Sequence, residues 1–131
     1  MIDLAVHGKY GAVSVRDIAQ RQEISAKYLE RLVPLLKKAK LVHALRGLYG
    51  GLMLGRPAKE ISLRDIVEAL EGPICLVKCV RAPSICKRSK ECLTFGLWRG
   101  MTKVISQSLS VISLAEMAKG IVLPHKLVLK L

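Results

Sequence analysis

Two short apolar patterns of helical period, followed by a hairpin pattern rich in glycine, constrain the fold of this chain more than any other feature. They occupy residues 14–56. Ser14 stands three residues before Asp17, which is the spacing of an N-terminal helix cap. The apolar residues that share one side of this first predicted helix are Val15, Ile18 and Ala19. We expect that side to face a core.

The second pattern begins after Ser25, which can cap a helix. Its apolar residues recur at i, i+3, i+4 and i+7 and define one face: Leu29, Leu32, Val33 and Leu36. The opposite face is polar and mostly basic: Lys27, Glu30, Arg31, Lys37 and Lys38. A short amphipathic helix with a basic outer face, joined to another helix by a tight turn, is a candidate recognition helix.

The hairpin pattern follows directly, with residues 41–45 and 52–54 as strands and 46–51 as the turn. Its glycines allow close backbone approach to a phosphate or to a minor groove, and Arg46 at the base can reach into that groove. A hairpin alone could equally be an ordinary one with no role in DNA binding. Together with the two helices, however, it predicts a winged helix-turn-helix in a mainly α chain with a small β-hairpin.

Size and charge agree with a DNA-binding domain. The chain has 131 residues, the length of one domain, and 22 basic against 10 acidic residues give a net charge of +12. Such a surplus favours a polyanionic partner, although a solvated basic surface would show the same charge. The uncharged run 104–115 is too short to span a membrane, and Asp3 is unlike the basic start of a secretory signal. We therefore expect a cytoplasmic protein without a membrane segment.

A third helix is predicted over residues 63–70, capped by Ser62 with Asp65 and ended by residues 71–73. Residues 74–91 then show no clear period. This loop and its end hold all four cysteines, Cys75, Cys79, Cys86 and Cys92, among the cations Lys78, Arg81, Lys87, Arg88 and Lys90. In a reducing compartment, such cysteines indicate metal ligands or redox thiols more than a disulfide framework. Buried or idle thiols remain the alternative.

A long helix is predicted from Leu93 to Ile112. Its apolar residues cover a wider arc than one packing face requires: Leu97, Trp98, Met101, Val104, Ile105, Leu109 and Ile112. A helix of this kind suits a dimer interface. We therefore divide the chain into a DNA-binding domain (1–72), a cysteine-bearing loop (73–91), and a dimerisation helix with a C-terminal tail (92–131).

The order and spacing of these pieces resemble the IscR-type (Rrf-two) family of bacterial winged helix-turn-helix transcriptional regulators. The segments that carry the resemblance are Val15-Arg16-Asp17-Ile18-Ala19, Ile24-Ser25 through Tyr28-Leu29-Glu30, Lys37-Lys38-Ala39 with Leu41-Val42, Arg46-Gly47 and Gly50-Gly51, Ile66-Val67-Glu68-Ala69 with Glu71-Gly72-Pro73, and Cys92-Leu93-Thr94 with Leu97-Trp98. Each is weak alone, but together they are specific and cover nearly the whole chain.

The resemblance implies a homodimer that binds a palindromic site in double-stranded DNA. It also implies an iron–sulfur cluster (2Fe–2S or 4Fe–4S), which a purified sample can lack, on the cysteines that match the family's three ligands: Cys79, Cys86 and Cys92. Thiolates are the ligands that such clusters require, the start of the long helix favours an anion at Cys92, and the flanking cations offset cluster charge.

Two departures from the family concern these expectations. Where one branch has a histidine as fourth ligand, this chain has Phe95, so Cys75 is either that ligand or, as we favour, a small core residue. Met1 aligns with the interior of the family's first helix. We therefore expect either a truncated start or the loss of helical turns that normally contact the DNA backbone.

For DNA contacts the resemblance points to Ser25, Lys27, Tyr28, Glu30 and Arg31 on the second helix and to Arg46 in the hairpin. Glu30 can accept a hydrogen bond from a cytosine amino group and Arg31 can donate to guanine. Ser25 and Tyr28 suit phosphate oxygens, and Lys27 supplies charge. For Glu30, a surface ion pair with a neighbouring lysine, Lys27 or Lys37, is equally consistent with the sequence.

The sequence therefore predicts a DNA-binding transcriptional regulator, and specifically a repressor whose activity depends on a cluster or on the thiol state. Two alternatives stay open: a cluster-free regulator that responds to a small molecule or a partner protein, and a metal-stabilised interaction or redox protein that does not read DNA. An enzyme is not expected, because the chain has no Ser-His-Asp order, no paired carboxylates and no phosphate-binding glycine loop. Packing or surface roles suffice for the three histidines, His7, His43 and His125.

Overall fold

The computed structural model describes residues 1–47 and 49–120. The tail 121–131, which includes His125, lies outside the described residues. The first half of the chain contains α1 (Ile2–His7), the 3-10 helix η1 (Gly8–Tyr10), α2 (Val15–Arg21), α3 (Ala26–Lys38), β1 (Val42–Leu45) and β2 (Gly51–Leu54). The second half contains η2 (Ala58–Glu60), α4 (Leu63–Glu71), α5 (Lys78–Arg81), η3 (Pro83–Ile85), α6 (Phe95–Ser110) and α7 (Leu114–Ala118).

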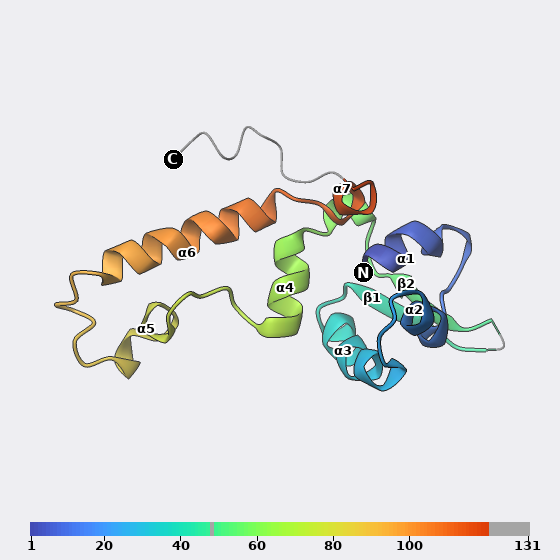
Figure 1. Ribbon diagram of the computed structural model, residues 1–131, viewed down its shortest axis with the longest axis horizontal. Helices are drawn as coiled ribbons and strands as arrows, with labels where there is room; N and C mark the ends of the chain where they lie inside the picture. The colour runs from blue at the N-terminus through green and yellow to red at the C-terminus, as the bar shows by residue number, and fades with distance from the viewer. Residues whose placement is uncertain (48, 121–131) are drawn as a thin grey trace.

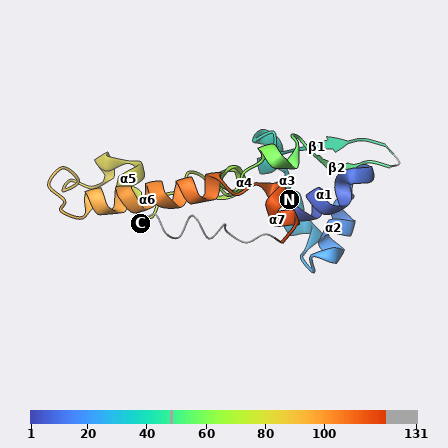
Figure 2. The same cartoon turned by 90° about the horizontal axis from the view of Figure 1, so that it is seen from above.

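The molecule is elongated, with a head at one end and a rod at the other (Figures 1 and 2). The head is formed by α1, α2, α3 and the β1–β2 hairpin, and α7 packs against α1 in it. α6 is the rod, with α5 beside its outer end and α4 between the rod and the head. This architecture confirms the predicted fold class, a mainly helical chain with one small hairpin. Among the described helices, none is long and apolar enough to cross a membrane.

Serine side chains cap the starts of four helices, as local sequence predicts. Ser14 accepts a hydrogen bond from the Asp17 amide at 3.0 Å, which fixes the start of α2. At α4 and α7 the exchange is reciprocal, because the acidic residue three positions on accepts from the amide of the capping serine. The capping serines are Ser14, Ser25, Ser62 and Ser113. Each such cap stabilises its helix by about 1 kcal/mol.

The hairpin pairs β1 with β2 in antiparallel register, from Val42 opposite Leu54 to Leu45 opposite Gly51. Val13, just before α2, adds one bridge to Leu52, so the hairpin is fastened to the helical part of the head. The strands occur where the sequence predicts them, within one residue at each changed end. The connecting turn is closed by the Gly50 amide, which donates to the Gly47 carbonyl at 2.9 Å.

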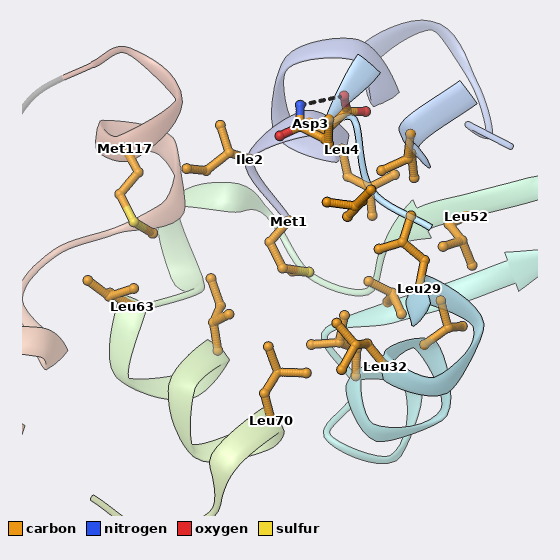
Figure 3. Close-up of a pocket in the computed structure, with 17 residues that line it drawn as sticks. Met1, Ile2, Asp3, Leu4, Leu29, Leu32, Leu52, Leu63, Leu70 and Met117 are labelled. Atoms are coloured by element: carbon orange, nitrogen blue, oxygen red, sulfur yellow. Dashed lines mark hydrogen bonds between the residues drawn. The ribbon is translucent and has the colours of Figure 1, made fainter. Parts of the chain in front are cut away.

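The core lies where α1, α2, α3, the hairpin and α7 meet. Its most completely buried side chains are Leu41, Ile61 and Leu114. Behind α3 the packing leaves an apolar cavity of about 340 Å³, lined by α3 residues such as Leu29 and Leu32 on one side and by α4 on the other. Met1 projects into the space between them (Figure 3). The inner face of α3 is therefore the apolar one, as its period predicts.

The base of the rod is paired with the chain segment that precedes α4. Ser62 and Ser113 form an isolated antiparallel bridge. On either side of it the Leu63 amide donates to the Ile112 carbonyl at 2.8 Å, and the Leu114 amide donates to the Ile61 carbonyl at 2.7 Å. Backbone pairing and a buried leucine thus attach α6 and α7 to the head.

Residues 74–91 are more ordered than the sequence indicates, because they contain the single turns α5 and η3. A turn of three or four residues is too short to show a period, so sequence reasoning could not detect it. The long helix is also shorter than the predicted span 93–112: α6 begins at Phe95 after Thr94 and ends at Ser110, whose hydroxyl donates to the Gln107 carbonyl.

Candidate nucleic-acid interface and thiol segment

The outer face of α3 carries five of the six residues predicted to contact DNA, and all five are exposed: Ser25, Lys27, Tyr28, Glu30 and Arg31. Ser25 caps α3, but the distance from the Tyr28 amide to its hydroxyl oxygen is 3.4 Å, which is long for such a bond. The hydroxyl hydrogen can still be donated to an outside acceptor. The Tyr28 side chain is about half exposed.

The charged groups of this face have no internal partners among the described residues. The described residues form three ion pairs, and none of them involves this face: Arg21 with Asp3, Arg56 with Asp65, and Arg64 with Glu68. The surface ion pair considered for Glu30 is therefore not formed in this structure. Lys27, Glu30 and Arg31 present two cations and one acceptor to solvent, which is the kind of set that reads base edges and phosphates.

The hairpin carries the sixth residue predicted to contact DNA. Arg46 follows β1 directly and is exposed at the start of the turn. Gly47, next to it, has φ +117°, a backbone conformation that favours glycine. Tyr49 is 90% exposed in the same turn. Sequence reasoning assigned Tyr49 no contact, although an aromatic residue within a glycine-rich turn could have indicated one. In Figure 1, α3 and the hairpin lie at the same end of the molecule, away from the rod.

An ion pair between a buried carboxylate and a partly exposed guanidinium holds α1 against α2, the helix that precedes α3. The Arg21 guanidinium donates to both carboxylate oxygens of Asp3, at 2.7 and 2.9 Å, and Gln22 donates to the same carboxylate at 3.3 Å. The Asp3 side chain is only 2% exposed. The hydrogen bond from Arg21 lowers the pKa of Asp3 and keeps the carboxylate charged. No local sequence pattern links residues 18 positions apart, so this pair was not predicted.

The three matched cysteines lie on one segment, at the end of α6 that is farther from α3 (Figure 1). We call residues 73–92 the thiol segment. Cys79 is in α5, Cys86 follows η3, and Cys92 stands shortly before α6. All three are half-buried free thiols. Cys75 lies nearer α4, and its Sγ donates to the Val77 carbonyl at 2.8 Å, so it is engaged in a local turn.

The surroundings of Cys92 favour its thiolate. Hydrogen bonds from the Thr94 hydroxyl and amide lower the pKa of the Cys92 thiol, and the Phe95 amide and Arg88 act in the same direction. The distance from Sγ to the Thr94 hydroxyl is 3.4 Å. This agrees with the expectation that a thiol at the start of the long helix is stabilised as an anion.

The donor chemistry of the segment fits an iron–sulfur cluster, because cysteine thiolates are the ligands of such clusters. In the part of the chain that the structure describes, which includes all four cysteines, no three cysteine, histidine, aspartate or glutamate side chains are close enough to hold a metal ion. The thiols share a segment without forming a ready ligand set.

Comparison with known proteins decides the family. The model of a family described as Rrf2, iron-dependent transcriptional regulator, matches residues 1–120. The chain belongs to the Rrf2 family. Among its relatives, protein rrf2 of Nitratidesulfovibrio vulgaris is 38% identical over 119 residues, which is 91% of this chain and 79% of that protein. The regulator IscR of Xenorhabdus nematophila is 38% identical over 120 residues, 92% of this chain and 73% of that protein.

Solved Rrf2 structures share the fold described above. CymR, the global cysteine regulator of Bacillus subtilis, superposes with a TM-score of 0.73 at 33% identity, covering 92% of this chain and 88% of that chain. IscR of T. potens superposes with a TM-score of 0.69 at 36% identity, covering 91% and 77%. The expected resemblance is thus confirmed. The chain is a transcriptional regulator of the winged-helix type. Membership of this family implies DNA as a partner, and the relatives are regulators and not enzymes.

One surface of this Rrf2 regulator is apolar and uncovered in the single chain. No residue of α6 is buried, and three large apolar side chains of its arc are exposed in the single chain. Leu97 is 59% exposed, and Met101 and Val104 are each 43% exposed. Contiguous apolar side chains along a 16-residue helix are a common feature of interaction surfaces.

Proposed function

We propose that this Rrf2 regulator is a homodimeric repressor that reads a palindromic promoter site and is controlled by its thiol segment. In this proposal residues 1–72 bind DNA, residues 73–91 sense, residues 92–131 dimerise, and the protein acts in the cytoplasm. The observation that carries it is the outer face of α3: exposed, basic, capped, and free of internal ion pairs among the described residues.

The contacts follow from the side-chain chemistry of that face. Arg31 donates to the O6 and N7 acceptors of guanine, and Glu30 accepts from the amino group of cytosine. Ser25 and Tyr28 donate to phosphate oxygens and so fix the register of α3 in the major groove. Two further cations add to this set, with Lys27 supplying charge beside the base contacts and Arg46 reaching from the hairpin into the neighbouring minor groove.

Dimerisation is supported by the uncovered arc of α6. Burying large apolar side chains such as Leu97 and Met101 against a second copy removes them from water, each contributing on the order of 1–2 kcal/mol. A two-fold axis that relates the paired rods would also relate the two α3 helices, and a palindromic site matches such symmetry.

A chain of contacts leads from the thiol segment through α6 and α4 to the head, and this chain gives a route for control. The Leu76 amide donates to the Thr102 hydroxyl at 3.4 Å, which links the segment to the middle of α6. α6 packs on α4, α4 packs on α3, and the base of the rod pairs with residues 61–63. A change in the order of the segment therefore alters how α6 sits, and with it the separation of the two reading helices.

The sensing group is either an iron–sulfur cluster on Cys79, Cys86 and Cys92 or the thiol state of the same residues. Control by thiol state needs no gathered ligand set, so it is compatible with the described residues, among which no three such side chains are grouped around one metal position. When bound, the cluster would join the three cysteines of the segment, and a signal that alters the cluster would alter this link. In both versions the segment controls DNA binding through its own conformation.

Selection of binding sites from random duplexes tests the DNA-reading function. We expect enrichment of a palindrome, protection of both half-sites in a footprint, and two protein chains per site in sedimentation. Enrichment of no sequence, together with a weak dependence of binding on salt concentration, would instead favour an interaction or redox protein that does not read DNA.

Anaerobic reconstitution with iron and sulfide tests the sensing group. If the cluster version holds, the visible spectrum and the iron count should be lost when Cys79, Cys86 and Cys92 are all changed to alanine. The single variant Cys75→Ala is the matched control and should keep both. A wild-type protein that takes up no iron would favour the cluster-free version, and a triple variant with an unchanged spectrum would remove the ligand assignment.

A further inference from the structure

The apolar cavity behind α3 is a feature of the head that the proposed function does not use. Leu29 and Leu32 of α3 stand on one side of it, and Leu63 and Leu70 of α4 stand on the other (Figure 3). Protein interiors hold few voids larger than a water molecule. With a volume of about 340 Å³, this space is therefore too large for an ordinary packing defect.

The lining of the cavity determines which kind of molecule fits. All of its side chains are apolar except those of Asp3 and Gln22. The Asp3 carboxylate is already bonded to Arg21 and to the Gln22 amide nitrogen. The Gln22 carbonyl oxygen accepts none of the described hydrogen bonds, so it can accept one from a ligand. A charged group would lose its hydration in this cavity without gaining a free partner, which favours a neutral ligand.

The volume sets the size of that ligand. An engineered cavity of about 150 Å³ with apolar walls takes up benzene. At the same volume per atom, a space of about 340 Å³ holds a molecule roughly twice the size of benzene, about 12 to 14 non-hydrogen atoms. Small-molecule sites in proteins are commonly of this kind, with mainly apolar walls and a few polar groups that fix the orientation of the ligand.

We propose that this cavity binds a neutral, mainly hydrocarbon small molecule with one hydrogen-bond donor, and that the bound molecule strengthens DNA binding. The donor faces the Gln22 carbonyl, and the hydrocarbon part lies between α3 and α4. Met1 projects into the space, and its flexible, unbranched side chain can move aside (Figure 3). The site itself is independent of the proposed function, whereas its effect on DNA binding rests on that function.

The two walls of the cavity connect its occupancy to the reading helix. α3 forms one wall and carries the predicted DNA contacts on its opposite, exposed face. α4 forms the other wall and packs on α6. An empty apolar space forfeits contacts on every side, so without a ligand α3 tends to move toward α4. A ligand that fills the space holds α3 in the described position, in which its reading face is exposed, and so favours DNA binding.

Fluorescence titration of the full chain with 1-naphthol tests the site. This probe is neutral at pH 7, has two fused apolar rings and carries one hydroxyl donor. We expect a Kd on the order of 100 µM, which is typical for a probe of this size. The matched compound is 1-naphthoate, which has the same rings and a negative charge. It should bind at least about 10-fold more weakly, because its carboxylate finds no free partner in the cavity.

Three variants locate the probe in the protein. Leu70→Trp places a larger ring in the α4 wall and should weaken 1-naphthol binding by about 10-fold or more, because the ring takes the space of the probe. Leu93→Trp makes the same change at a side chain that is 100% exposed, and should bind as the wild type does. Gln22→Leu keeps the apolar space but removes the acceptor, and should weaken binding by about 5-fold. Thermal unfolding without the probe establishes which variants fold, and Gln22→Leu carries the test if Leu70→Trp does not.

The effect on DNA is measured with the selected site. Saturating 1-naphthol should raise the DNA affinity of the wild type by about 5-fold or more, and saturating DNA should raise the affinity for 1-naphthol by the same factor. Leu93→Trp should behave in the same way. In Leu70→Trp the probe should leave DNA affinity unchanged.

Equal binding of 1-naphthol to Leu70→Trp and Leu93→Trp, or equal binding of 1-naphthol and 1-naphthoate to the wild type, would overturn the site. So would probe binding that disappears as the protein dimerises, since a second copy would then fill the space. Probe binding with unchanged or weaker DNA affinity would overturn the regulation. Failure of the proposed function gives a different result, because no DNA sequence would then be preferred with or without the probe, while the titration of the cavity would be unaffected.

Discussion

Replacing Leu114 with alanine should loosen the attachment of the rod to the head. Its side chain is fully buried, and its amide donates a hydrogen bond to the carbonyl of Ile61, another fully buried residue. Leu→Ala changes at such positions cost about 2–5 kcal/mol, through lost burial and the cavity left behind. For a chain of 131 residues this corresponds to a fall in Tm of roughly 7–18 °C.

Thermal and urea unfolding measure this effect, with Leu35→Ala as the matched control. Leu35 is 40% exposed, so the same chemical change should cost about 1 kcal/mol, less than at the fully buried Leu114. Conditions that alter the thiol segment should also have a smaller effect on the DNA affinity of Leu114→Ala than on that of the wild type. A Leu114→Ala protein as stable as Leu35→Ala would refute the reasoning that the rod is fixed to the head at this point.

Three further predictions concern the β1–β2 hairpin, the Asp3–Arg21 ion pair and the Cys92 thiol. In Gly50→Ala the new Cβ would lie 2.6 Å from the Leu45 carbonyl oxygen, so the turn must shift, and gel shifts should show weaker DNA binding. Because the folded-state pKa of Asp3 is lowered, its contribution to stability is present above the unfolded pKa of about 3.9 and is lost as pH falls through the lower folded value. The urea midpoint should therefore fall from about pH 5 downward, and less so in Asp3→Asn. Thr94→Val should slow alkylation of Cys92 at pH 7, measured by peptide mass spectrometry, because the lost hydroxyl stabilises the thiolate; an equal rate would contradict that cause.

Local sequence signals predicted the parts of the fold that short-range physics determines. The serine caps, the apolar side of α3 and the glycine turn of the hairpin each depend on residues a few positions apart, and the structure confirms them. The family followed from the order of these pieces. The DNA contacts and the cluster ligands were taken from the resemblance and stay predictions.

What the sequence did not reveal depends on long-range contacts. The Asp3–Arg21 pair and the Ser62–Ser113 bridge join residues 18 and 51 positions apart, with no periodic signal between them. The local structure around the cysteines was also not predictable, because their spacing along the chain does not say how a segment of single turns folds. The single turns α5 and η3 were missed for the same reason.

The most direct measurement of the central claim is the affinity for the selected DNA site of a variant with a neutralised reading face, Lys27→Ala/Arg31→Ala. The matched control, Lys59→Ala/Arg64→Ala, removes two exposed cations outside α3. If α3 reads the duplex, the first variant should bind the selected site more weakly. Loss of one good base contact weakens binding by about 5- to 150-fold, and we expect a loss of that size or larger for this variant. Its thermal unfolding should remain like that of the wild type, and the control should keep wild-type affinity. Equal affinity of the two variants for the selected site would contradict the claim that α3 is the reading helix.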